Sequence, residues 1–139
     1  MKRILNFISL IGDSYLKIVH PVCEKYRLTA TEFDILLFLA NNPEYDTATE
    51  IVEKRHIVKS HVSISIKSLE QRGYIERTYK DNNRRTIHLK LCASADNAVK
   101  DGQKAQRLFY KILTKDIPKE QLENLQNCFE LMQENLKKF

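Results

Sequence analysis

The chain has 139 residues, 42% hydrophobic and 29% charged, a balance typical of one folded domain and unlike that of a disordered chain. Only three glycines and three prolines leave few turns, which favours helices over a sandwich of short strands. No apolar run approaches the roughly 18 residues of a membrane-spanning helix. The three cysteines are far apart and form no CxxC pair, so we expect a cytoplasmic protein without a disulfide framework, metal or cofactor.

The first predicted element is a long amphipathic helix over residues 4–26, where apolar side chains recur at steps of three and four. Asn6 and Ser9 interrupt its apolar run, so we do not expect a signal peptide. Pro21 lies inside the pattern and predicts a kink or break near His20.

Three shorter helices are expected next. The first follows Leu28, with Thr29 or Thr31 as its N-cap, and stops before Pro43. The second runs from about 48 to 56. Thr47 and Glu50 have the spacing of a capping box at its start.

The third of these helices spans about 59–72 and ends at Gly73, a residue suited to a left-handed cap. The β-branched and aromatic runs 74–79 and 86–91 predict two strands, and residues 80–85 between them predict a hairpin tip.

Helix is predicted again over 94–116, and a last helix starts near Pro118. The last helix has an apolar stripe at Leu122, Leu125, Phe129, Met132 and Leu136. The predicted fold is therefore mainly α with a small β-hairpin wing, an α+β arrangement in which two short helices and a hairpin form a winged helix-turn-helix.

Positive charge is concentrated in one segment of the chain. Residues 54–90 contain ten basic and three acidic side chains, a net charge of +7, whereas the remainder carries −2. A local basic stripe on a nearly neutral body is typical of polyanion binding, although a solvated basic face has the same composition.

The helix predicted at 59–72 has two different faces. Val62, Ile66 and Leu69 fall on one side and are expected in the core, while the other side has short polar side chains suited to a major groove. Seen alone, that polar side is more typical of a solvent face than of a DNA-binding face. The arginines of the hairpin favour DNA binding, because they can reach a narrow minor groove or a phosphate. We predict DNA contacts from the exposed helix face and the hairpin, by Lys59, Ser60, His61, Ser63, Ile64, Lys67, Arg77, Lys80, Arg84 and Arg85.

At these residues the chain resembles the MarR family of bacterial transcriptional regulators. The resemblance rests on Leu28-Thr29 and Glu32-Phe33, on Ser60, Val62, Ser63, Ile66 and Leu69-Glu70, on the run 73–77, on Arg84-Arg85, on Leu91 and on Asn135-Leu136. It covers nearly the whole chain and is most specific over residues 60–91.

The resemblance implies a single domain that forms a homodimer. Residues 28–92 would be the winged helix-turn-helix core, and 1–26 and 94–139 the dimerisation helices. Such a dimer would bind a palindromic operator on double-stranded DNA, without membrane or enzyme activity, and would act as a repressor released by a small molecule or an oxidant. Arg85 matches the wing arginine that enters the minor groove. The wing departs from the family at Asn83, where an aspartate usually holds that arginine, and Asp81 is a possible substitute.

Two signal-sensing sites and one rival function are kept open. Cys23 is a candidate redox sensor, because Lys25 and Arg27 are close in sequence and could favour a thiolate, although buried free cysteines are common. Tyr15, Tyr26 and Phe33 could line an effector pocket or belong to the core. The rival function is a winged-helix module whose arginines bind acidic proteins instead of DNA.

Overall fold

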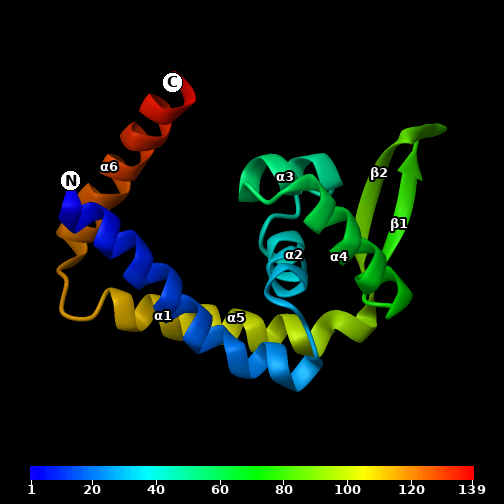
Figure 1. Ribbon diagram of the computed structural model, residues 1–139, viewed down its shortest axis with the longest axis horizontal. Coiled ribbons are helices and arrows are strands. Elements are labelled where there is room, and N and C mark those ends of the chain that lie inside the picture. Colours follow the sequence, from blue (N-terminus) through cyan, green and yellow to red (C-terminus); the bar gives the residue numbers. More distant parts are fainter.

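The computed structural model describes all residues from 1 to 139 as six α-helices and one two-stranded antiparallel hairpin (Figure 1). The elements in chain order are α1 (Lys2–Tyr26), α2 (Ala30–Asn41), α3 (Ala48–Arg55), α4 (Lys59–Gln71), β1 (Ile75–Lys80), β2 (Asn83–Leu91), α5 (Asp96–Leu113) and α6 (Lys119–Lys137). A short 3-10 turn, Ala93–Ala95, precedes α5. The predicted order of four helices, a hairpin and two helices is confirmed.

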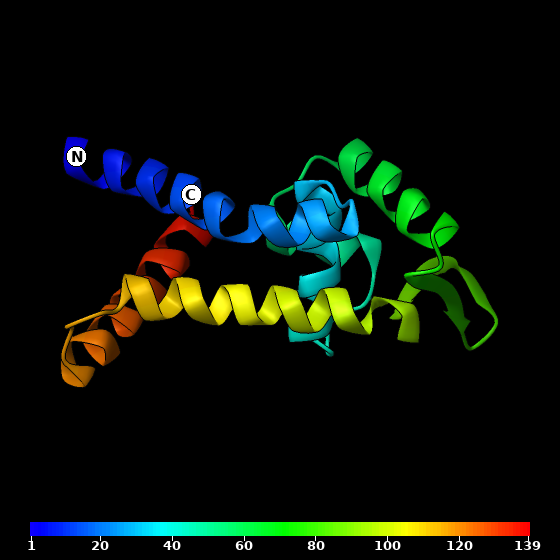
Figure 2. The same cartoon turned by 90° about the horizontal axis from the view of Figure 1, so that it is seen from below.

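Two long helices form the spine of the molecule. α1 and α5 lie side by side, as both views show (Figures 1 and 2). The hairpin and α4 lie at one end, while α6 and the first turns of α1 lie toward the other (Figure 2). The hairpin and α4 are therefore far from α6 and from the first turns of α1, although α1 and α5 also contact α2.

α2 is the centre of the core. All five residues from Ile35 to Leu39 are buried, together with Phe33. The apolar sides of α4, α5 and β2 pack around it. A helix that is apolar on nearly every side requires such surrounding neighbours.

The helix ends match their predicted signals. The Thr29 side chain accepts the Glu32 N–H at 3.1 Å, which identifies Thr29 and not Thr31 as the N-cap of α2. Thr47 and Glu50 form the complete capping box of α3. Gly73 has a φ of +74°, a backbone conformation that favours glycine.

Two local features differ from what the sequence predicts: the break in α1 is absent, and the hairpin turn has another length. α1 runs unbroken through Pro21, because contacts with α5 hold it on both sides: Tyr15 packs edge-on against Phe109, and Tyr26 bonds to Asp101. The hairpin turn is also shorter than expected. Only residues 81 and 82 form it, with φ of 52° and 59°, so Arg84 and Arg85 belong to β2. Two successive residues with positive φ are typical of a tight type I′ turn.

The apolar stripe of α6 is uncovered in the single chain. No residue of this helix is buried, and Phe129 and Met132 are 49% and 53% exposed. No helix of the structure has the length and apolar character required to cross a membrane.

A close approach between α5 and α2 depends on Gly102. A Cβ at this position would lie 2.7 Å from Cδ2 of Leu37 and 2.9 Å from Cε2 of Phe33, both in the buried core. We expect Gly102→Ala to lower the free energy of unfolding by about 1–2 kcal/mol, because overpacking outweighs the gain in helix propensity. Urea denaturation measures the change.

The matched control is Gly12→Ala in α1, where an added Cβ meets nothing within 4 Å. We expect that variant to be neutral or slightly more stable. An equal loss in both variants would contradict the packing explanation.

Candidate nucleic-acid interface

α4 presents a buried face to the core and a polar face to solvent. Val62, Ile66 and Leu69 are at most 4% exposed, as predicted. Ser60, His61, Ser63, Ile64 and Lys67 are all exposed, and Lys59 is exposed at the first turn. Because these side chains are exposed and form no ion pair within the chain, the face is free to enter a groove.

The connection between α3 and α4 is tight. His56 has a φ of 52° and ends α3, and only Ile57 and Val58 separate it from Lys59. Val58 is the N-cap of α4 and provides no side-chain acceptor. The first N–H groups of α4 therefore remain available to an external acceptor, such as a phosphate oxygen.

Arg84 and Arg85 lie in a part of the hairpin where the pairing between β1 and β2 is irregular. Thr78 pairs with His88 and Lys80 pairs with Asn83, so one residue of β1 faces four residues, 84–87, of β2. Such an irregularity redirects side chains from the regular alternation of a strand. Arg84 lies over the Tyr79 ring, 5.7 Å from its centroid, and Arg85 is exposed.

Neither wing arginine has an acidic partner. Asn83 stands where the family would have an aspartate, and its Oδ1 accepts the backbone N–H of Arg85 at 2.9 Å. Asp81 forms no ion pair, so it does not substitute for that aspartate. The guanidinium groups of Arg84 and Arg85 thus keep their hydrogen-bonding capacity for an external anion.

Two of the residues predicted to contact DNA, Arg77 and Lys80, form ion pairs with acidic side chains of the protein. Arg77 Nε lies 2.8 Å from Glu70 Oε2, and Lys80 Nζ lies 3.3 Å from Asp46 Oδ2. Both pairs are partly exposed to solvent, so each contributes little to stability. They orient β1 against α4 and against the loop before α3.

Asp46 is a residue that sequence reasoning missed. Its Oδ1 lies 2.7 Å from Nδ1 of His88, and its backbone carbonyl accepts the N–H of Leu89 at 2.7 Å. Together with Lys80, these contacts tie both strands of the hairpin to the loop before α3. A lone aspartate in a loop gives no sequence signal for this role.

The charge state of Asp46 follows from these contacts. Partial burial by itself would raise its pKa, but hydrogen bonds from His88 and Lys80 outweigh that effect and hold the pKa below the ordinary value. The carboxylate is therefore the favoured form in the folded protein.

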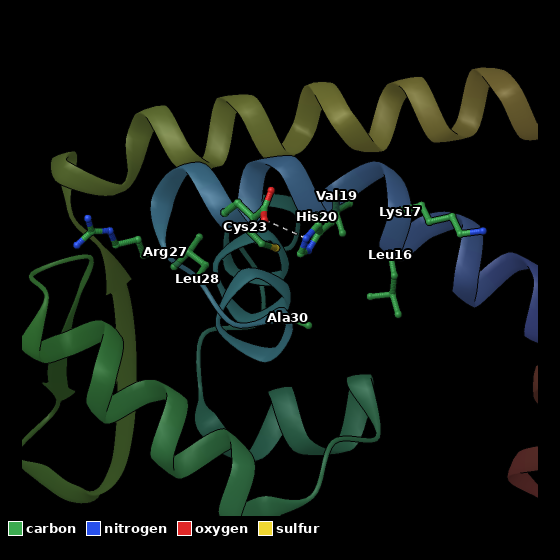
Figure 3. A pocket seen from close by; sticks show the side chains of 9 residues that line it. Leu16, Lys17, Val19, His20, Cys23, Arg27, Leu28 and Ala30 are labelled. Carbon is green, nitrogen blue, oxygen red and sulfur yellow. Dashed lines mark ion pairs between the residues drawn. The ribbon is translucent and has the colours of Figure 1, made fainter.

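The expected effector residues lie apart from each other. Tyr15 and Phe33 line a cavity of about 260 Å³ with Asp34 and Arg55, whereas the Tyr26 hydroxyl donates to Asp101 on α5. A larger cavity of about 650 Å³ lies beside the junction of α1 and α2 (Figure 3). It is lined by Leu16, Lys17, Val19, His20, Cys23, Glu24, Arg27, Leu28 and Ala30.

Cys23 lies in the wall of this larger cavity and is buried. Burial raises the pKa of its thiol, and Lys25 is paired with Asp101 instead, with Nζ 2.7 Å from Oδ2. The premise that nearby cations favour a thiolate was therefore wrong. Redox sensing itself stays a prediction.

Comparisons with known proteins agree with the geometry. Residues 28–85 match the sequence model of the MarR family. The HTH-type transcriptional regulator PecS of Dickeya dadantii (strain 3937) is 33% identical over 89 residues. That match covers 63% of this chain and 52% of PecS, so it spans about half the length of the relative.

Solved structures share the fold over almost the entire chain. A MarR family transcriptional regulator from Listeria monocytogenes, complexed with 26mer DNA, gives a TM-score of 0.86 at 20% identity, covering 98% of this chain and 90% of that one. A MarR transcriptional regulator from Methanosarcina mazei Go1 gives 0.81 at 21% identity, covering 99% of both chains.

The pH dependence of stability tests the role of Asp46. A lowered pKa stabilises the folded state above the unfolded aspartate pKa of about 3.9, and this stabilisation is lost as the pH falls through the folded value. We expect Asp46→Asn to be less stable than the parent at pH 7, with a difference that shrinks below about pH 4. Urea denaturation between pH 7 and pH 3 measures it.

Asp13→Asn is the control, because Asp13 is exposed on α1 and has no ion pair. A difference between Asp46→Asn and the parent that stays constant across the pH range would refute the carboxylate's role.

Proposed function

We propose that this chain, whose residues 28–85 match the sequence model of the MarR family, is a transcriptional regulator of that type and not an enzyme. In this proposal it is a homodimer that binds a palindromic operator on double-stranded DNA and represses transcription there. The observation that carries the proposal is the joint position of two free polar surfaces. α4, which has the exposed polar face, and the hairpin, whose β2 contains the unpaired Arg84 and Arg85, lie at the same end of the molecule (Figure 1).

Each surface has a separate task in the proposed complex. α4 enters the major groove, where Ser60, Ser63 and Lys67 meet base edges and phosphates. The wing reaches the flanking minor groove, where arginine is attracted by the strong negative potential. Arg77 and Lys80, already paired with carboxylates, contact phosphates at the edge of the same interface.

Selection of bound fragments from random double-stranded DNA by the purified full chain tests this function. We expect paired half-sites in inverted orientation, and an affinity that falls steeply with salt as counterions are released. Binding without sequence preference, or no binding at any salt concentration, would overturn the proposal and favour an acidic protein partner.

A dimer is proposed because the chain leaves large apolar side chains uncovered at the end opposite the wing. α1 exposes Ile4, Phe7 and Ile8, and α6 exposes all of its stripe except the half-buried Leu122. Several large apolar side chains left uncovered at one end of a molecule are typical of a protein interface. A second copy of residues 1–26 and 94–139 would cover it with matching apolar side chains.

Substitutions in α6 test the dimer. Leu125 and Leu136 are 43% and 74% exposed in the single chain, so a charge there costs the isolated fold little. In a dimer seam the same charge would be buried without a partner. We therefore expect Leu125→Asp and Leu136→Asp to give folded monomers in analytical ultracentrifugation.

Asn127→Asp is the matched control, because Asn127 lies on the opposite, polar side of α6 from the apolar stripe. We expect it to remain dimeric. Stable dimers of both leucine variants would reject the proposed seam.

The substitution Arg85→Ala tests whether the wing binds the minor groove. If Arg85 reads the minor groove, its loss weakens binding to the selected operator by ~1–3 kcal/mol at constant salt. Fluorescence anisotropy with labelled operator measures the dissociation constant. Arg107→Ala removes the same charge from an exposed position of α5 and should bind almost normally. Equal effects of both substitutions would show that Arg85 supplies charge only.

Release from DNA is proposed to follow small-molecule binding at the α1–α2 junction. The larger cavity has an apolar wall that includes Leu16, Val19 and Leu28, and it adjoins the start of the central helix α2. Tyr15 and Phe33 line the smaller cavity, which shares Leu16, Val19 and Ala30 with the larger one, and Tyr26 lines neither. Burial of Cys23 disfavours the alternative of an oxidant signal. Thiol alkylation that releases the operator would favour the oxidant instead.

A further inference from the structure

Arg72 connects the end of α4 to the junction between α1 and α2. Its Nη1 donates to the carbonyl oxygen of Arg27 at 2.8 Å and to Oε2 of Glu32 at 3.2 Å. Its Nη2 donates to the carbonyl oxygen of Tyr26. The guanidinium also lies over the Tyr74 ring, 4.8 Å from its centroid.

These acceptors are strong ones. The carbonyls of Tyr26 and Arg27 lie at the C-terminal end of α1, where helix carbonyls lack partners within the helix and have partial negative charge. Glu32 is a buried acid, only 7% exposed. A planar guanidinium can bond to several such acceptors in fixed directions, which a lysine ammonium does not reproduce.

No other hydrogen bond joins residues 59–72 to α1. The remaining contacts of α4 with the body of the protein are mainly apolar and run through α2. Apolar packing is not directional, whereas a guanidinium fork restrains both direction and distance. Arg72 is thus a directional link between the helix with the proposed DNA face and a helix of the proposed dimer.

We propose that Arg72 is a positioning residue that holds α4 at one orientation relative to α1 and thereby determines which half-site spacing the dimer accepts. This inference rests on the proposed function. In a two-fold dimer, the separation and rotation of the two α4 helices must match the DNA helix. One inserted base pair turns a half-site by roughly 35° and moves it by about 3.4 Å.

The decisive variant is Arg72→Lys. It keeps a positive charge beside Glu32 and removes the fork that spans the three acceptors. Dissociation constants are measured for the selected operator and for operators with one base pair inserted or removed between the half-sites. The parent is expected to lose about tenfold or more on the altered spacings, a loss comparable with one wrong base pair.

Arg72→Lys is expected to bind all three spacings within about threefold of one another, while selecting the same half-site sequence. A merely structural role would not have this effect, because lower stability weakens binding at every spacing alike. Glu32→Gln is the matched control. It removes the ion pair but leaves both carbonyls for Arg72, so the spacing preference should persist.

A double variant separates the loss of the Arg72 fork from the effect of leaving the Glu32 carboxylate buried without a partner. Arg72→Gln combined with Glu32→Gln removes the fork and the carboxylate together, and it should relax the spacing in the same way. If dimers of both variants keep the parent's spacing penalty, or if neither variant forms a folded dimer that binds the cognate operator, the inference is overturned. If the parent itself selects no paired half-sites, the proposed function fails instead.

Discussion

α2 buries five consecutive residues, Ile35 to Leu39, and therefore has no solvent-facing stripe along its middle. It must be covered from every side, and the arrangement of the other elements follows from that requirement. α4 and β2 cover it on the winged side, and α5 approaches so closely that Gly102 has no room for a Cβ. The position of the proposed interface therefore depends on how α2 is enclosed.

Charges divide into those that hold the winged part together and those left free. Asp46 ties the hairpin to the loop before α3, Glu70 holds Arg77, and Arg72 binds the end of α1. Arg84 and Arg85 have no such partner, and the face of α4 is equally unengaged. Paired charges orient the interface, while unpaired ones remain for an anion. This division explains how a chain with a modest net charge of +5 can present a strongly basic end.

The molecule has a second free surface, formed by the uncovered apolar residues of α1, α5 and α6. Only 21 of the 139 residues are buried in the single chain, because its two ends project away from the core around α2. One end is polar and basic, and the other is apolar. In a two-fold assembly through the apolar end, each chain would contribute one basic end, and Arg72 joins the end of α4 to the C-terminal end of α1.

The sequence by itself determined the local structure. Thr29, Thr47, Glu50 and Gly73 marked helix boundaries because capping and left-handed conformations depend on neighbouring residues alone. The polar face of α4 and the wing arginines were found for the same reason, since helical period and turn chemistry are local. Tertiary contacts decided the remainder. Pro21 does not break α1, because α5 supports the helix, and Cys23 is buried with a raised pKa.

The partners of Asp46 and Arg72 could not have been predicted either. They join residues about 40 positions apart in the chain, and an ionisable side chain in sequence does not show which groups will surround it. Composition and spacing specify which elements form. Only their packing specifies which charges are neutralised and which remain free, because electrostatic interactions depend on distances in space.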